Sequence, residues 1–141
     1  MRVTAKGAGF ANMDKLIRIV ICTRHTLLRE GIKALLTRGG PIEIAGEAVT
    51  TAEAVALLTR VIPDVILMDP CAPDLSGSEA TRLMKAACPH VKVLVLALDA
   101  DASVIADCIL AGASAYIGNY DEPRHLRIAI RGVCGKKARA A

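Results

Sequence analysis

The chain has 141 residues and a mass of 14.8 kDa, the size of one domain that buries roughly two thirds of its unfolded surface. Hydrophobic residues make up 53% of it, but its longest apolar stretches, such as Val91 to Leu98 with Lys92 inside, are far shorter than the ~20 residues of a membrane helix. The net charge is +4, although residues 19–122 carry 8 basic and 13 acidic side chains, so the positive charge is concentrated at the ends. These values exclude a membrane-spanning protein and predict a soluble one.

Five apolar runs of strand length alternate with segments of helical periodicity. This alternation is typical of a parallel sheet covered by helices on both faces. Most of the runs are rich in β-branched residues without polar interruption, which indicates burial from both sides, and the second is more polar. The predicted strands are Ile19–Cys22, Ile42–Ala45, Val65–Met68, Val91–Leu98 and Ala115–Ile117.

The first three predicted helices have clear start and stop signals. The first ends at Gly39-Gly40-Pro41, where neither residue type continues a helix readily. Thr50-x-x-Glu53 and Ser76-x-x-Glu79 predict capping boxes that open the second and third helices. The apolar stripes of the first and third helices are Leu28, Ile32, Leu35 and Leu36, and Ala80, Leu83, Met84 and Ala87.

The last two helices are predicted from similar signals. The fourth runs from about Asp101 to Ala111, and Gly112 stops it. The fifth begins at Pro123, a residue favoured in the first turn. Its inward-facing residues are Leu126, Ala129, Ile130 and Val133.

Both ends lie outside the predicted domain. Residues 1–16 contain no apolar segment typical of a secretory signal, so we assign them to a flexible N-terminal segment. The last 19 residues carry six basic and no acidic side chains, which allows a nucleic-acid contact but favours a solvated helix face followed by a linker, because no aromatic or recognition-helix pattern accompanies them. The domain is therefore predicted over 17–134, with a basic tail or linker over 135–141.

Asp69 ends a buried strand at the edge of the sheet where doubly wound α/β proteins bind ligands. Around it, several short motifs follow one another with a characteristic spacing. They are Arg29-Glu30-Gly31, Gly46-Glu47-Ala48, Asp64-Val65-Ile66-Leu67-Met68-Asp69, Ser76-Gly77 and Ala111-Gly112-Ala113-Ser114-Ala115-Tyr116. On these motifs, Ile17 to Val133 resembles a response-regulator receiver domain of the NarL/LuxR type. The resemblance implies a CheY-like (flavodoxin-like) (βα)5 doubly wound parallel sheet with strand order 2-1-3-4-5.

The resemblance also identifies the site, where this sequence departs from the family. Asp69 matches the phosphoacceptor, and Tyr116 matches an aromatic position that moves on activation. In the family an acidic pair after the first strand helps to hold Mg²⁺, a Thr or Ser ending the fourth strand binds the phosphoryl group, and a Lys follows the fifth strand. The altered positions here are Thr23 and Arg24, Ala97 and Asn119.

These departures predict a degenerate phosphorylation site. Mg²⁺ prefers octahedral oxygen ligands, and Asp69 alone beside a guanidinium is a poor site, so no metal cofactor is expected. We predict instead that Arg24 pairs with Asp69, the alternative being that Arg24 points to solvent. A conventional phosphorylated receiver would require replacement ligands from loops, and the candidates are Asp74, Asp99 and Asp101.

The cysteines and histidines suggest no further chemistry. Five cysteines without CxxC spacing predict a reducing cytoplasm. Cys22 and Cys71 flank the crevice, which raises a redox-sensor hypothesis, but two inert thiols are favoured. No metal cluster of His25 with His90 or His125 is expected.

The sequence therefore predicts a cytoplasmic signalling module rather than an enzyme. It is an atypical, phosphorylation-independent receiver, acting through protein partners or through a helix-turn-helix effector that is not in this chain and that alone would contact DNA. The alternatives are a conventional Asp69-phosphorylated receiver and a small-ligand-binding pseudo-receiver. Expected partners are a second copy, through the first or fifth helix, and a sensor kinase or other regulatory protein.

Overall fold

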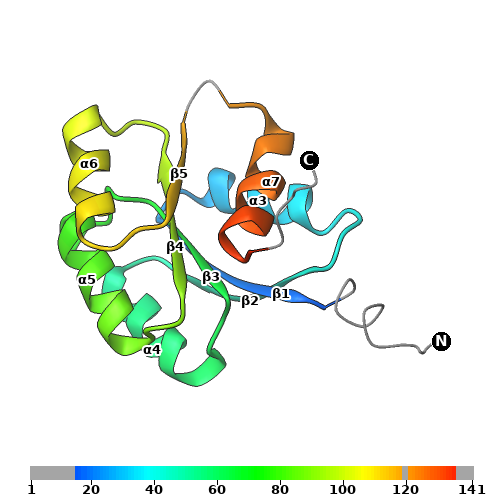
Figure 1. Cartoon of the computed structure of the whole chain (residues 1–141), viewed down its shortest axis with the longest axis horizontal. Coiled ribbons are helices and arrows are strands. Elements are labelled where there is room, and N and C mark those ends of the chain that lie inside the picture. The colour runs from blue at the N-terminus through cyan, green and yellow to red at the C-terminus, as the bar shows by residue number, and fades with distance from the viewer. Residues whose placement is uncertain (1–14, 119–120, 136–141) are drawn as a thin grey trace.

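The computed structural model describes residues 15–118 and 121–135. Its centre is one parallel sheet with strand order β2-β1-β3-β4-β5 (Figure 1). The strands are β1 (Ile17–Cys22), β2 (Ile42–Ala48), β3 (Val65–Met68), β4 (Lys92–Ala97) and β5 (Ala115–Gly118). They alternate with the helices α3 (Thr26–Leu36), α4 (Thr51–Val61), α5 (Gly77–Ala87), α6 (Ala102–Leu110) and α7 (Pro123–Val133). This arrangement confirms the predicted (βα)5 fold and its strand order.

The strands follow the apolar runs closely, except at the end of β2. β3 is buried along its whole length, as expected of a central strand in a doubly covered sheet. β2 continues through Gly46 and Glu47, beyond the predicted end at Ala45. The reason is a register shift against β1, where Ile19 pairs with Ile44 but the next residue pairs with Gly46. The shift lets the polar second half of β2 remain in the sheet.

The helix signals were mostly read correctly. Ser76 and Glu79 form the predicted capping box at α5, with both reciprocal hydrogen bonds present. At α4 the Thr50 hydroxyl accepts the Glu53 N–H, but the Glu53 carboxylate accepts from the N–H of Val49, one residue earlier than a capping box requires. Pro123 opens α7, and Gly112, with φ +122°, follows α6. No helix of the described residues is long and apolar enough to cross a membrane.

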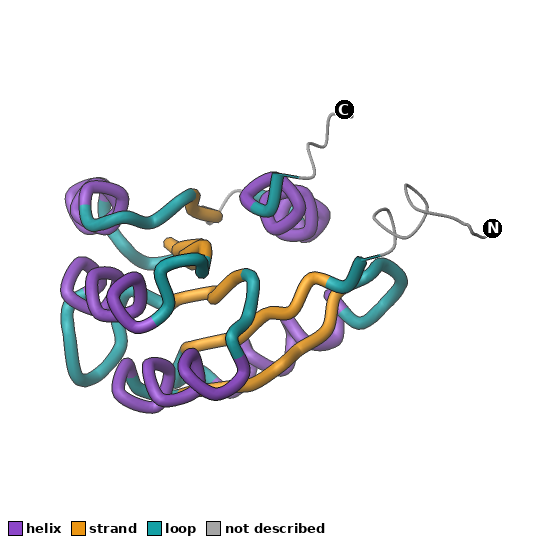
Figure 2. The backbone as a smooth tube through the Cα atoms, turned by 60° about the horizontal axis from the view of Figure 1, so that its bottom comes forward, coloured by secondary structure: helices purple, strands orange, loops and turns teal. Residues whose placement is uncertain are grey.

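The two faces of the sheet are covered differently. Three helices, α4, α5 and α6, lie on one side and two, α3 and α7, on the other (Figures 1 and 2). The core of the three-helix face is rich in small residues, among them Ala54, Ala80 and Cys108. The core of the two-helix face consists mainly of isoleucine and leucine.

Each face has a glycine at which a Cβ would meet a neighbouring side chain. On the three-helix face, a Cβ at Gly77 would lie 2.7 Å from the Cys108 Sγ and 2.9 Å from the Pro70 Cβ. On the two-helix face, a Cβ at Gly40 would collide with the Arg127 guanidinium. Arg127, on α7, donates through Nη2 to the carbonyl oxygens at the end of α3, so this side chain connects the two helices. The carbonyls belong to Leu35, Leu36 and Arg38, at 3.1, 3.3 and 3.3 Å.

Candidate functional site

Asp69 follows β3 directly, at the edge of the sheet that the sequence predicted. Its backbone N–H donates to the carbonyl oxygen of Cys22 on β1, 2.9 Å away, which continues the parallel pairing one residue beyond the strand. The residue is only 8% exposed. A carboxylate at this depth must be compensated by hydrogen bonds.

Both oxygens of the Asp69 carboxylate accept hydrogen bonds from the protein. The Thr23 hydroxyl donates to Oδ2 at 2.9 Å, and the backbone N–H of Cys71 donates to Oδ1 at 2.9 Å. Thr23 is completely buried, and its hydroxyl oxygen also accepts the N–H of His25 at 3.1 Å. The hydroxyl that replaces a family carboxylate is thus fixed against Asp69.

The predicted salt bridge between Arg24 and Asp69 was wrong. In the part of the chain that the structure describes, Arg24 has no ion pair, and its side chain is exposed. The ring of His25 approaches Asp69 instead, with Nε2 3.7 Å from Oδ2. Thr23 continues the burial of β1 by one residue, and the chain becomes exposed at Arg24, where it leaves the sheet.

Arg29 holds the segment that carries Thr23. Its Nη1 donates to the backbone carbonyl of Thr23 at 2.7 Å, and its Nε donates to Glu47 at 3.1 Å. Only 15% of the Arg29 side chain is exposed, so this pair is better shielded from solvent than an ordinary surface ion pair. Our sequence reasoning used Arg29 as a motif residue and missed this anchoring.

The remaining predicted site positions differ in their surroundings. Ala97 is 5% exposed and packs in the core of the three-helix face, while its neighbours Leu96 and Leu98 line the crevice. Asn119 lies outside the described residues. Tyr116, on β5, is 52% exposed, and its role as a switch residue stays a prediction.

The three loop carboxylates have different surroundings. Asp74 accepts the backbone N–H groups of Thr51 and Ala52 at 3.0 and 3.1 Å, and these bonds, that of Thr51 first, lower the pKa of its carboxyl. Asp101 precedes α6 and accepts a hydrogen bond from the hydroxyl of Ser103 at 3.3 Å. Only Asp99 of the three lines the crevice beside Asp69.

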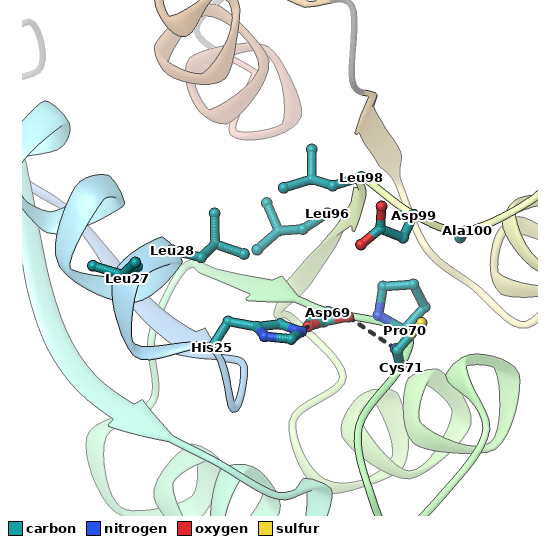
Figure 3. A pocket seen from close by; sticks show the side chains of 10 residues that line it. All are labelled: His25, Leu27, Leu28, Asp69, Pro70, Cys71, Leu96, Leu98, Asp99 and Ala100. Atoms are coloured by element: carbon teal, nitrogen blue, oxygen red, sulfur yellow. Dashed lines mark hydrogen bonds and ion pairs between the residues drawn. The ribbon is translucent and has the colours of Figure 1, made fainter.

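The crevice is a cavity of about 300 Å³. Figure 3 shows the Asp69 carboxylate on one side of it and leucine side chains of α3 and β4 on the other, with the Asp99 carboxylate directed inward. Its lining is His25, Leu27, Leu28, Asp69, Pro70, Cys71, Leu96, Leu98, Asp99 and Ala100. An apolar lining of this kind is typical of a small-molecule pocket.

The donors around Asp69 do not fit a magnesium site. Among residues 15–118 and 121–135, no group of three or more His, Cys, Asp or Glu side chains could hold a metal ion. Mg²⁺ is usually held by one or two carboxylates together with waters, and here the Thr23 hydroxyl stands beside Asp69 where the family pattern has an acid. The hydroxyl satisfies the carboxylate without a cation.

The thiols beside the site are poorly activated. Burial raises the pKa of the Cys22 thiol to about 12, with a further contribution from the negative charges of Asp74 and Asp69. The pKa of the exposed Cys71 thiol is also raised, by partial burial and by the charges of Asp69 and Asp99. Thiolates are the reactive form of cysteine, so the upward shift of both pKa values supports the interpretation as inert thiols.

Comparisons with known proteins agree on the fold. Residues 19–131 match the family model described as "Response regulator receiver domain". The transcriptional regulatory protein DegU of Brevibacillus brevis is 41% identical over 104 residues, covering 74% of this chain and 44% of the relative. The chain spans about half the length of the curated relatives it matches.

Solved structures give the same result. A LuxR-family two-component response regulator from Aurantimonas sp. SI85-9A1 superposes with a TM-score of 0.80 at 27% identity, covering 86% of this chain and 87% of that one. The signal receiver domain of the putative response regulator NarL from Mycobacterium tuberculosis gives a TM-score of 0.78 at 24% identity, covering 86% and 98%. The second likeness concerns the fold alone.

Proposed function

This chain belongs to the response regulator receiver family, and on that premise we propose that it is an atypical receiver that signals without phosphorylation of Asp69. The single observation that carries the proposal is the buried hydrogen bond from Thr23 to Oδ2 of Asp69. The neutral Thr23 hydroxyl donates to the Asp69 carboxylate from a position where the family pattern has a metal-binding acid.

The chemistry of phosphoryl transfer explains why this exchange matters. Charge develops on the equatorial oxygens of the transferred group and must be neutralised by metal ions and positioned donors. Here Thr23 and Arg24 replace the acidic pair, Ala97 supplies no hydroxyl, and Asn119 replaces the lysine. The loss of all these groups is expected to reduce the rate of Asp69 phosphorylation by several orders of magnitude.

Phosphorylation is tested with acetyl phosphate and Mg²⁺, followed by intact mass spectrometry and peptide mapping. We expect the protein to remain unmodified, while a receiver that retains the acidic pair is modified under the same conditions. The matched variant Thr23→Asp/Arg24→Asp/Ala97→Thr restores three family groups and is expected to gain an adduct. A stable adduct on Asp69 of the unaltered protein, absent from Asp69→Asn, would establish a conventional receiver instead.

We further propose that the output is a change of protein contacts in the cytoplasm rather than catalysis. DegU is named as a transcriptional regulator and is about twice as long as the region matched here, so a DNA-binding effector and a sensor kinase are the partners that this family suggests. Any contact with DNA would be made through that effector.

The receiver itself is expected to form homodimers through α3 or α7. Residues 123–141 carry six basic and no acidic side chains, and these would repel across a two-fold axis unless they meet acids such as Glu30, whose side chain is 57% exposed. Association should therefore change with ionic strength. Light scattering over a concentration series at low and high salt tests this, and a strict monomer throughout would remove the dimer from the proposal.

A further inference from the structure

The cavity beside Asp69 combines negative charge with apolar walls. Asp99 directs its carboxylate into the cavity (Figure 3), and in the described part of the chain it has no hydrogen-bond or ion-pair partner. Asp69 lies across from it. Its hydrogen bonds come from neutral donors, and the basic group beside it is the His25 ring, whose Nε2 is 3.7 Å from Oδ2. The site therefore offers one buried and one open carboxylate to the same space.

The Cys71 thiol lines the cavity, and its pKa responds to the charges around it. Burial raises the pKa of the Cys71 thiol, the charges of Asp69, Asp99 and Asp101 add to this shift, and the charge of Arg24 opposes it. The cavity is thus an unfavourable place for a phosphate or another anion and a favourable one for a cation.

The apolar wall continues well beyond the carboxylates. A second cavity of about 330 Å³ lies between α3 and the start of α7, and it shares four leucines with the first. The shared residues are Leu27, Leu28, Leu96 and Leu98. Leu27 is 88% exposed, which is unusual for so large an apolar side chain and leaves it free to cover a ligand. Together the two cavities form a groove with Asp69 and Asp99 at one end, apolar side chains along the middle, and Asp121 and Glu122 at the far end.

We infer that this groove binds a small organic cation, namely a primary amine on an apolar body, with the ammonium group between Asp69 and Asp99. An ammonium has three N–H donors and one apolar substituent, which matches two carboxylates backed by leucines. No group of three or more His, Cys, Asp or Glu side chains among the described residues could hold a metal ion, and the leucines beside the carboxylates match an organic cation better than a hydrated metal. The inference rests on the proposed function, because a receiver that accepts phosphate and Mg²⁺ would fill the same space with them.

The probe is phenethylammonium chloride, titrated into the 141-residue protein and followed by amide chemical shifts in two-dimensional NMR. We expect saturable binding in the millimolar range, as is usual for such small ligands, with shifts centred on residues 69–71 and 96–100. 2-Phenylethanol has nearly the same shape and should bind about tenfold more weakly, because it carries no positive charge and offers one donor instead of three. Phenylacetate should not bind. 4-Phenylbutylammonium should bind more tightly than the shorter amine, since its chain reaches the second cavity.

Two variants separate the ends of the groove. Asp99→Asn should weaken both amines about tenfold and leave 2-phenylethanol unchanged. Asp107→Asn removes the same charge from exposed α6, outside the groove, and should change nothing. Leu27→Ala, at an exposed position, should weaken 4-phenylbutylammonium more than phenethylammonium.

Three results would overturn the inference: no saturable binding of either amine, equal binding of the amine and the alcohol, or equal effects of Asp99→Asn and Asp107→Asn. The acetyl phosphate experiment keeps its failure distinct from that of the proposed function. If Asp69 stays unmodified and the amines do not bind, this inference fails and the proposed function stands. If Asp69 becomes phosphorylated, the atypical receiver is wrong, and this inference fails with it.

Discussion

The two faces of the sheet show different ways of attaching helices to one set of strands. On the three-helix face, alanine, glycine and cysteine let α4, α5 and α6 approach closely, and Gly77 fits against Pro70 and Cys108 with no room for a methyl group. On the two-helix face, larger side chains leave a cavity between α3 and α7, and Arg127 spans the helices with hydrogen bonds. Close packing favours a single arrangement, whereas a cavity and a polar bridge leave room for another molecule.

The difference in packing suggests that the two faces of the sheet have different roles. The three-helix face supplies stability, and the two-helix face, which borders Asp69, supplies the surface that can respond to a ligand or partner. If this is right, equivalent substitutions on the two faces will have unequal effects.

The largest effect is expected for leucine truncation. Leu58→Ala on α4 removes a side chain that is fully buried, and should lower the free energy of unfolding by about 3–4 kcal/mol. Leu126→Ala on α7 borders the cavity and should cost about 2 kcal/mol, because fewer contacts surround it. Urea denaturation of both variants measures the difference. Equal losses would show that the two faces are packed alike.

Replacing glycine by alanine should have opposite effects on stability on the two faces. Gly77→Ala places a methyl group against Cys108 and Pro70 and should destabilise the protein by about 1–3 kcal/mol, part of which Cys108→Ala should restore. Gly31→Ala, on α3, meets no atom within 4 Å and should stabilise the helix by about 0.5–1 kcal/mol. Thermal unfolding of the single and double variants checks both signs. A neutral Gly77→Ala would remove the argument for close packing.

A smaller, pH-dependent effect would sharpen the comparison on the three-helix face. Asp74 joins the loop after β3 to the first turn of α4, so Asp74→Ala should cost about 1 kcal/mol at neutral pH. Because folding lowers the pKa of this carboxyl below its ordinary value of 3.8, the contribution is present above that value and disappears as the pH falls through the folded pKa.

The measurement is a series of denaturation curves from pH 7 to about pH 3. The gap between the wild type and Asp74→Ala should stay constant in the upper part of this range and narrow toward the acid end. Asp107→Ala, which removes an exposed aspartate from the interior of α6, serves as the control, whose gap should not change over this range. A gap for Asp74→Ala that does not narrow would mean that the Asp74 charge is not what stabilises α4.

The sequence predicted the fold well because its signals are local. Val65–Met68 is an unbroken apolar run, and Ser76 and Glu79 form the capping box that their spacing indicates. The end of β2 was missed because it depends on a register shift against β1, which no local pattern contains. The edge that carries Asp69 was predicted from the direction of parallel strands alone.

The contacts within the site were harder to predict, because they depend on the direction in which each side chain points. Charge favoured Arg24 as the partner of Asp69, whereas the inward turn after β1 selected Thr23. Both faces of β1 are covered, so burial continues through Cys22 to Thr23, and no local pattern marks the residue at which it ends. Arg127 was read as part of a solvated basic helix face, yet it bonds to carbonyls about 90 residues away in the sequence, a contact that no periodicity reveals.

The buried bond between Thr23 and Asp69 changes how genetic experiments on this protein should be interpreted. Replacing the acceptor aspartate is a direct way to ask whether phosphorylation matters in a cell. Here Asp69→Ala would also leave the Thr23 hydroxyl and the Cys71 amide without their acceptor, so a loss-of-function phenotype would report damaged structure as readily as lost signalling. The more informative allele is Asp69→Asn, which removes the charge and keeps one side-chain oxygen as an acceptor at this position.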